Sequence, residues 1–332
     1  MNTVTIYDVA RAAEVSIATV SRVINSPHKV NDATRQRVLA AIDELGYVPR
    51  AEASARARRS EQRIGVIAPF FTRRAFVQRL RGLSSALLGT PYELIVYNAD
   101  SPLHCRRYLE SLPIARRLDG LVLMSLFVED AVAQRFLEHG LHAVTIETTY
   151  PAFSSVAIDN VTGGVIAARY LLEKGHRRLA FVGGDSEIPG YTLHTSELRL
   201  QGFRQALGEA GVGLPAMYVA ESSYSLEEGR RLAHELFALS TPPTAIFAAS
   251  DAQAMGALKA AKERGMTVPD DVAVIGFDDL DIADYIGLTT IRQSLDESGR
   301  VAIELLLSRL SEPMRPVQHV RLPLELIPRE TA

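Results

Sequence analysis

A short stretch near the amino terminus places small polar side chains and one arginine on a single helical face. The spacing of Val20, Val23 and Ile24 predicts a helix that begins after Ser16 and buries one side. The opposite face carries Ala18, Ser21, Arg22 and Asn25. Short side chains let a helix approach the major groove of DNA, and a guanidinium can pair in bidentate fashion with a guanine edge. The pattern indicates a helix that reads base edges; a helical hairpin with a solvated face is the alternative.

Another helical pattern precedes this one in the sequence and is separated from it by three residues. A third helical pattern follows. In the first, apolar residues recur at positions 6, 9, 10 and 13 behind Thr5, a natural N-cap with Asp8 three residues on. In the third, Asn31 is the expected N-cap and Gly46 the expected C-cap. All three segments are short and amphipathic, so they predict one small all-α unit that ends at Pro49.

Aromatic, acidic and basic side chains follow several predicted strands farther along the chain. Aromatic rings cover the apolar C–H faces of a polyol, while forked polar groups bridge its adjacent hydroxyls. The candidate residues for such a site are Phe70, Phe76, Asp159, Arg199, Tyr224, Ser250, Asp251, Phe277 and Asp278. Core packing explains each aromatic residue equally well at this point, and helix N-capping explains each aspartate, Asp251 in particular.

Buried strands alternate with amphipathic helices from Arg63 onward. One set of strands is IGVIAPF, YELIVYN, DGLVLMSL and HAVTIE, and a second set is SVAID, RLAFVGG, MYVAES, TAIFAAS and DVAVIGFDD. Two such sets predict two doubly wound α/β lobes with a ligand cleft at the carboxyl ends of their strands. The final run, VRLPLELIPRE, is expected to supply lobe-crossing and closing strands. The fold class is therefore multidomain, a small all-α unit followed by a two-lobed α/β core.

Composition and charge narrow the classes of protein that fit. The chain has 332 residues, 47% of them hydrophobic, which is enough for more than one core. Its single cysteine excludes an intrachain disulfide and a zinc site of clustered thiolates. The sequence shows neither a secretory signal nor an apolar run of about 20 residues, so a soluble, cytoplasmic protein is expected. The net charge is -3, yet residues 1–63 hold ten Lys/Arg and seven Asp/Glu, so the basic character is concentrated in the amino-terminal part.

Specific runs of residues resemble the lactose-repressor (LacI/GalR) family of bacterial transcription regulators. In the amino-terminal part these are the stretch from Thr5 to Asn25, most specifically TVSRVIN, and LGYVP at 45–49. In the core they are HRRLAFVGG, LRLQGF, AIFAASDAQAMGALKAA, VPDDVAVIGFDD and LTTIRQ. The resemblance implies a helix-turn-helix headpiece at 1–49, a hinge at 50–62 and a periplasmic-binding-protein-like effector-binding and dimerisation core at 63–332. Glu14 stands where the family often has Gly, so a strained left-handed turn is expected there.

The resemblance also assigns candidate contacts with double-stranded DNA. Arg22 is expected to contact bases, and Ile17 and Ala18 are small enough to meet a thymine methyl group. The contacts expected mainly with phosphates, or fixing the register, come from Thr5, Tyr7, Ser16, Thr19, Ser21 and Asn25. In the hinge the candidates are Arg50, Ala53 and Arg56, and Arg56 falls where the family has a Leu that wedges between base pairs. Arginine can read a narrow minor groove but is a poor apolar wedge.

Effector contacts follow from the same resemblance. Arg199 and Asp278 match the family's effector-holding arginine and strand-end aspartate, and Phe76 and Tyr224 match its ligand-stacking aromatics. Ser250 stands where several members have Asn. The loop at 185–195 is longer than usual and offers Tyr191 as a further contact.

The resemblance implies a transcriptional regulator that is controlled by a small-molecule effector. We expect the regulator to be a repressor and the effector to be a sugar. A purine or nucleoside is the alternative effector, because stacked aromatics suit bases too. An enzyme on a two-lobed scaffold and an exported solute receptor are the rival classes. No catalytic motif, metal site or cofactor site is recognised, so we expect no enzyme. Only Glu330–Ala332 follow the last strand, without the leucine-heptad tail of the tetrameric lactose repressor, so a homodimer on a pseudopalindromic operator is expected.

Overall fold

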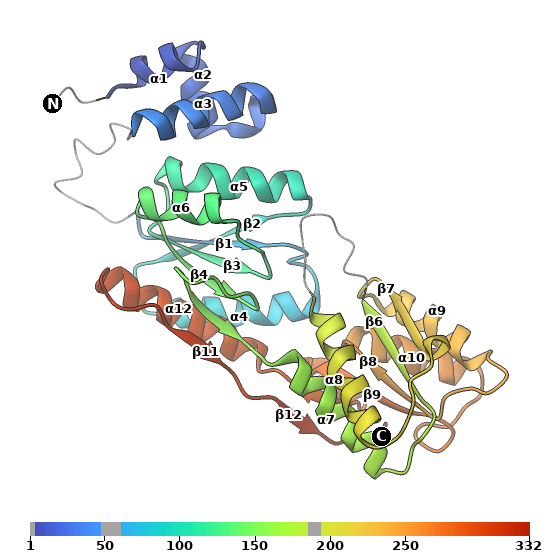
Figure 1. Cartoon of the computed structure of the whole chain (residues 1–332). Helices are drawn as coiled ribbons and strands as arrows, with labels where there is room; N and C mark the ends of the chain where they lie inside the picture. Colours follow the sequence, from blue (N-terminus) through green and yellow to red (C-terminus); the bar gives the residue numbers. More distant parts are fainter. Residues whose placement is uncertain (1–3, 48–60, 185–193) are drawn as a thin grey trace. The chain divides into compact units, whose positions relative to one another are not determined.

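The computed structural model describes residues 4–47, 61–184 and 194–332 (Figure 1). Its contacts divide the chain into two compact units. Unit 1 comprises residues 1–71, 84–155 and 302–318, and unit 2 comprises residues 72–83, 156–301 and 319–332. The chain therefore passes between the units several times, once within helix α4 (Arg74–Leu87) and once within helix α12 (Leu295–Ser311).

The amino-terminal helices are α1 (Ile6–Ala12), α2 (Ile17–Asn25) and α3 (Asp32–Leu45), with a 3₁₀ turn η1 at Pro27–Lys29. The predicted caps are confirmed. The side chains of Ser16 and Asn31 accept hydrogen bonds from the backbone N–H groups at the starts of α2 and α3, and Gly46 ends α3 with φ 59°. Glu14 has φ 53°, which confirms the expected left-handed turn between α1 and α2.

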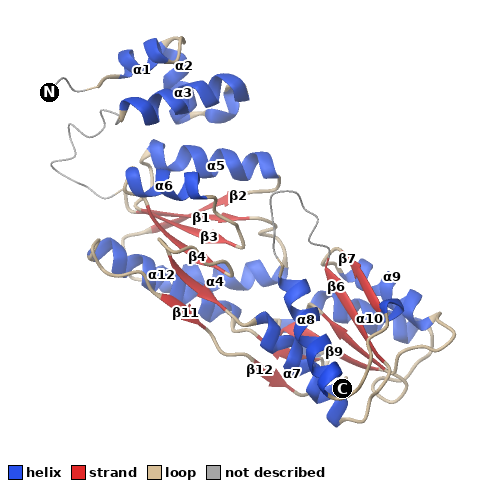
Figure 2. Cartoon of the chain, in the orientation of Figure 1, coloured by secondary structure: helices blue, strands red, loops and turns tan. Residues whose placement is uncertain are grey.

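The first sheet has the order β11-β5-β4-β3-β1-β2. Its strands are β1 (Arg63–Ala68), β2 (Glu93–Asn98), β3 (Gly120–Met124), β4 (His142–Ile146), β5 (Ser154–Ala157) and β11 (His319–Arg321). Strands β1 to β4 pair in parallel. Helices α5 (Pro102–Ala115) and α6 (Asp130–Glu138) cover one face, as Figure 2 shows. The other face packs against the end of α12, because a Cβ at Gly120 would meet the Leu306 side chain.

The second sheet has the order β12-β10-β9-β8-β6-β7. Its strands are β6 (Leu179–Gly184), β7 (Val219–Ser222), β8 (Ala245–Ala248), β9 (Ala273–Asp278), β10 (Thr289–Arg292) and β12 (Glu325–Ile327). Helices α7 (Asn160–Glu173) and α8 (Thr195–Glu209) share one apolar cluster with the sheet. Helices α9 (Leu226–Phe237) and α10 (Asp251–Glu263) share another. Figure 2 shows these two helix pairs on opposite faces of the sheet.

The two sets of strands and the helices between them confirm the predicted fold class. The last run of the chain does hold two strands: β11 joins the first sheet and β12 pairs antiparallel with β10 in the second. Among the described residues, three short elements were not predicted: the helix α11 (Asp281–Tyr285) and the 3₁₀ turns η1 and η4 (Ala216–Tyr218). Within the described ranges, no helix is both long enough and apolar enough to cross a lipid bilayer.

Candidate functional site

Helix α2 buries one side and leaves the predicted reading face in solvent. Val20, Val23 and Ile24 lie in the small core formed with α1 and α3. On the opposite side Ala18 and Arg22 are exposed, and Ile17 has 39% of its surface exposed. The Ser16 hydroxyl both caps the helix and lies 2.9 Å from the Thr19 hydroxyl. The helix therefore presents one guanidinium among short side chains, which is the arrangement the sequence predicted.

The other candidate DNA contacts fall into three groups. Tyr7 is exposed on α1, and Ser21 is half-buried on α2. The Thr5 hydroxyl donates to Asp8 at 2.6 Å, a bond that holds the pKa of that carboxyl below its usual value. The side chain of Asn25 and the residues Arg50, Ala53 and Arg56 lie outside the described residues, so the predictions for the hinge remain predictions.

In unit 2, Arg199 is the fifth residue of α8 and lies close to the carboxyl end of β8 in the second sheet. Its side chain is 3% exposed. Its Nε donates to the Asn160 side-chain oxygen at 2.9 Å, and its NH1 donates to the Ala249 carbonyl. The guanidinium also stacks on the Phe277 ring, 3.5 Å from its centroid. The head group is thus held in one orientation from three sides, as a residue that binds a ligand with forked geometry requires.

Three aspartates lie together where β9 ends and α10 begins. Asp278 accepts a hydrogen bond from the Gln293 side-chain amide. Asp251, with none of its surface exposed, accepts from the Leu280 N–H at 2.7 Å and from the Thr290 hydroxyl at 2.5 Å. Asp279 pairs with Arg292 and Arg329 at 2.7 and 2.8 Å. Burial and the neighbouring Asp278 carboxylate raise the pKa of Asp251 to about 7.

The raised pKa of Asp251 predicts how stability depends on pH. In the unfolded chain its pKa is near 3.8, so between that pH and about 7 the folded protein binds more protons than the unfolded one. The contribution of Asp251 to the free energy of unfolding is therefore fully present below the pKa of this residue in the unfolded chain. It is lost as pH rises through 7. We expect thermal melts of Asp251→Asn to lose a pH-dependent stabilisation of at least about 1.4 kcal/mol, the equivalent of one pKa unit. Parallel pH profiles of both proteins would contradict this.

Tyr224 is held by its neighbours on β6 and α8. Its hydroxyl lies 3.2 Å from the Thr195 hydroxyl, and its ring lies directly over Gly184, where a Cβ would collide with it. The guanidinium of Arg73 lies 6.0 Å from the ring centroid. Burial raises the pKa of Tyr224 and lowers the pKa of Arg73. Arg73, which the sequence reasoning did not select, is thus a half-buried cation close to a predicted ligand-stacking ring.

Several candidates have local structural roles. Asp159 caps α7, accepting from the Thr162 N–H at 3.0 Å, and Ser250 caps α10, accepting from the Gln253 N–H at 3.2 Å. The alternative that Asp251 is an N-cap is therefore wrong, because that position belongs to Ser250. Phe277 is fully buried in the core beneath Arg199, so it supports that residue from below. Tyr191 lies outside the described residues.

Comparison with known proteins places this geometry in a family. Residues 5–50 match the model of the bacterial regulatory proteins of the lacI family, and residues 168–332 match the periplasmic binding protein-like domain. The HTH-type transcriptional repressor PurR of Klebsiella pneumoniae is 34% identical, covering 98% of this chain and 96% of its own. The repressor CytR of Escherichia coli is also 34% identical, and the match covers 92% of this chain and 89% of CytR. The chain belongs to the LacI family.

Solved structures of LacI-family proteins agree over the whole length. The lac repressor dimer bound to operator and an anti-inducer has a TM-score of 0.71 and 27% identity, and the match covers 99% of both chains. A complex of the transcriptional regulator CelR with cellobiose has a TM-score of 0.73 and 30% identity, covering 99% of this chain and 100% of the other. This LacI-family chain is therefore a DNA-binding transcriptional repressor with an effector-binding domain. Since its relatives are repressors, the enzyme alternative is set aside.

In unit 1 of this LacI-family chain, sequence reasoning missed two strand-end residues. Ser125 follows β3 with φ 56° and Glu147 follows β4 with φ 72°, and the Ser125 hydroxyl donates to the Glu147 carboxylate. Phe70, which was predicted, follows β1 with φ 54°. Non-glycine residues in this conformation are uncommon and gather at ligand sites. Ser125 and Glu147 are, like Asp278, polar residues at the end of a buried strand, and this pattern is present in the predicted strands DGLVLMSL and HAVTIE.

Among the described residues, no group of three or more His, Cys, Asp or Glu side chains is arranged to hold a metal ion. Asp251, Asp278 and Asp279 instead take their partners from hydroxyl, amide and guanidinium groups of the same unit. These buried carboxylates are therefore held by hydrogen bonds and ion pairs within unit 2.

Proposed function

We propose that this protein is a dimeric repressor that binds a pseudopalindromic operator and releases or tightens it in response to a sugar. The observation that carries the proposal is the exposed face of α2, with Arg22 among small side chains, joined in one chain to the Arg199 and Asp278 constellation. Effector and operator each favour one arrangement of the two lobes, so each changes the affinity of the other by the same factor.

For the operator, we propose that Arg22 reads a guanine edge and that Ile17 and Ala18 meet a thymine methyl group. Thr5, Tyr7, Ser16, Thr19, Ser21 and Asn25 fix the register on phosphates, and residues 50–62 act as the hinge. The exposure of Ile17, Ala18 and Arg22 supports these roles.

For the effector, we propose that Arg199 and Asp278 hold adjacent hydroxyl groups while Tyr224 and Phe76 cover an apolar face. The fixed guanidinium of Arg199 and the placement of Tyr224 over Gly184 support this assignment. Two similar structures carry sugars, CelR with cellobiose and a LacI-family regulator from Enterococcus faecium with ribose. A nucleobase is the second candidate, because the Tyr224 ring backed by Arg73 also suits stacking on a base.

A thermal-shift screen tests the effector assignment. The full-length protein is melted with sugars, sugar phosphates, nucleosides and nucleobases, because a saturating ligand raises the melting temperature by mass action. We expect one sugar class to raise it and to change the affinity for operator DNA in the same concentration range. A shift caused by nucleobases alone would replace the sugar by the second candidate. No shift with any compound would contradict the effector proposal.

The proposed dimer has a candidate surface in unit 2. Tyr285 at the end of α11 is 86% exposed, and the neighbouring Ile286 is also exposed. Val77 on α4 is exposed as well, and a cavity of about 390 Å³ is lined by Val77, Leu280 and Ile282. Exposed apolar side chains that gather on one surface commonly mark a protein interface. A structure similar to this one is a lac repressor dimer on its operator, which agrees with this proposal.

We expect light scattering to give twice the mass of one chain. Tyr285→Glu should raise the dimer dissociation constant by at least about tenfold, because a buried charge without a partner is costly at an interface. Met314→Glu is the matched control, since Met314 is 95% exposed after α12 in unit 1. A stable tetramer, or equal weakening by both substitutions, would contradict the proposed surface.

A further inference from the structure

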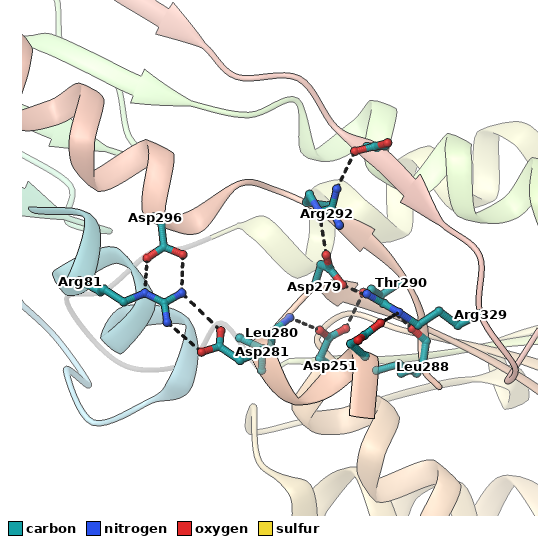
Figure 3. A network of polar contacts seen from close by, with 12 residues as sticks. Arg81, Asp251, Asp279, Leu280, Asp281, Leu288, Thr290, Arg292, Asp296 and Arg329 are labelled. Carbon is teal, nitrogen blue, oxygen red and sulfur yellow. Dashed lines mark hydrogen bonds and ion pairs between the residues drawn. The ribbon is translucent and has the colours of Figure 1, made fainter. Parts of the chain in front are cut away.

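The turn that follows β9, Asp278 to Asp281, has a strained backbone that its surroundings hold in place. Asp278 has φ 127° and Asp279 has φ 56°, both in a region that side-chain-bearing residues rarely adopt. Asp251 accepts the Leu280 N–H at 2.7 Å, and Asp279 is paired with Arg292 and Arg329, as Figure 3 shows. Strain of this kind persists only where neighbouring contacts fix it, so the turn is sensitive to changes in those contacts.

Arg81 of α4 contacts the end of this turn. Its Nε and NH2 donate to the two carboxylate oxygens of Asp296 at 2.6 and 2.7 Å, and its NH1 donates to Asp281 at 2.9 Å (Figure 3). Asp281 is the first residue of α11, and Asp296 lies in the first turn of α12. The two carboxylates raise the pKa of Arg81, and Asp296 has the larger effect. One guanidinium thus joins three helices, and one of its partners belongs to the turn.

The backbones of α4 and α12 are in direct contact beside this arginine. A Cβ on Gly82 would collide with the Asp296 carbonyl oxygen, and a Cβ on Gly299 would collide with the Arg79 carbonyl oxygen. No side chain separates the helices at these positions, so a displacement at one backbone cannot be absorbed by side-chain rearrangement before it reaches the other. Helix α4 then continues from unit 2 into unit 1 at residue 84.

We propose that Arg81 is a positioning residue that couples the Asp278–Asp281 turn to helix α4, so that a change at the Asp278 carboxylate reaches the part of α4 in unit 1. The proposal rests on the proposed function only in assigning Asp278 to the effector site. The relevant ligand chemistry is a hydroxyl or amide group that donates a hydrogen bond to the Asp278 carboxylate, beside the one from Gln293. The chain of contacts is Asp278, the strained turn, Asp281, Arg81 and α4.

An ordinary surface ion pair is the competing explanation. Arg81 and Asp281 are both 56% exposed, and isolated pairs with that exposure contribute little to stability. Arg81 differs from an isolated pair because its contact with Asp296 is bidentate and its guanidinium is shared between two carboxylates. A second path also reaches α4, because Arg79 donates to the Gln293 oxygen at 3.1 Å and the Gln293 amide donates to Asp278. The experiment must separate the two paths.

Amide hydrogen exchange of α4, measured by mass spectrometry on the full chain without DNA or small molecules, makes that separation. Asp278→Asn is introduced into the wild type, into Arg81→Gln and into Arg300→Gln. The last is the matched control, because Arg300 pairs with Glu297 within α12 and is similarly exposed. In the wild type and the control we expect Asp278→Asn to change α4 exchange by about fivefold, the lower end of couplings between protein sites. In Arg81→Gln we expect the change to fall within about twofold, the usual error of additivity.

Two results would overturn the proposal. A change of equal size in Arg81→Gln would assign the coupling to Gln293 and Arg79, and the absence of any change in α4 in the wild type would show that the turn and the helix are independent. Circular dichroism melts verify that each variant folds, and Arg81→Lys, which keeps the charge but loses the fork, replaces Arg81→Gln if that variant does not fold. Because no effector or operator enters the measurement, its failure is distinguishable from a failure of the proposed function.

Discussion

Replacing Arg22 by alanine should lower the preference for operator over random DNA by about 1–3 kcal/mol, the value of one bidentate arginine–guanine pair. Arg22 is exposed on the side of α2 opposite Val20 and Val23, which are buried, so its loss should leave the headpiece fold intact. Binding to random DNA depends on the number of cationic groups near phosphates and should fall by a much smaller factor. Fluorescence anisotropy titrations with both duplexes at one salt concentration measure the two affinities.

Arg11→Ala is the control for the loss of charge. Arg11 belongs to α1, is largely exposed and lies 4.0 Å from the Asp8 carboxylate. The substitution Arg11→Ala therefore removes one cation from the same headpiece and leaves the exposed face of α2 unchanged. We expect it to weaken binding to both duplexes to a similar extent. If Arg22→Ala also weakened both equally, Arg22 would be a phosphate contact and the reading face would have to lie elsewhere.

Replacing Arg199 by glutamine should reduce the affinity for the effector at least about tenfold, because hydrogen bonds to a charged group contribute about 1.5–3 kcal/mol each. The guanidinium is fixed by Asn160, the Ala249 carbonyl and the Phe277 ring, so its orientation is set before a ligand arrives. The measurement is calorimetric titration with the compound identified in the thermal screen. Operator binding without effector should change little.

The same contacts give Arg199 a structural role, which the design must separate from binding. Removing the guanidinium leaves the Asn160 and Ala249 oxygens without that donor, so the melting temperature without ligand should fall as well. Arg199→Lys retains the charge but places its N–H donors on a single nitrogen without the planar fork, so it should recover stability more than affinity. Arg169→Gln, which removes an exposed partner of Glu209, is the surface control. If Arg199→Gln and Arg169→Gln bound the effector with equal affinity, Arg199 would not be an effector-binding residue.

Local signals in the sequence predicted much of this fold. Helix caps at Ser16, Asn31 and Gly46 are decided by residues within one turn, so their prediction needed no tertiary information. Buried strands alternating with amphipathic helices likewise indicated two α/β lobes. The pairing of β11 with β5 and of β12 with β10 depends on contacts between residues far apart in sequence, and no local pattern specifies them.

Within the candidate site, residue type predicted Arg199 and Asp278 but not the roles of their neighbours. Phe277 and Asp251 looked like ligand contacts because they stand at strand ends, yet both are fully buried, one beneath Arg199 and one on the Leu280 N–H. Arg73 was missed because its proximity to Tyr224 joins segments about 150 positions apart, and sequence spacing carries no such information. Tertiary packing decides which of several suitable side chains faces a ligand.

The central claim is that one chain reads duplex DNA with its amino-terminal helices and adjusts that reading through a small molecule bound to its core. The most direct test titrates the full-length protein against a palindromic duplex selected from a randomised pool and against its scrambled counterpart, at moderate salt, with and without the compound from the thermal screen. We predict a preference for the palindrome of about 10³-fold or more and a change in that preference when the compound is added. Equal affinity for both duplexes, with and without the compound, would contradict the claim.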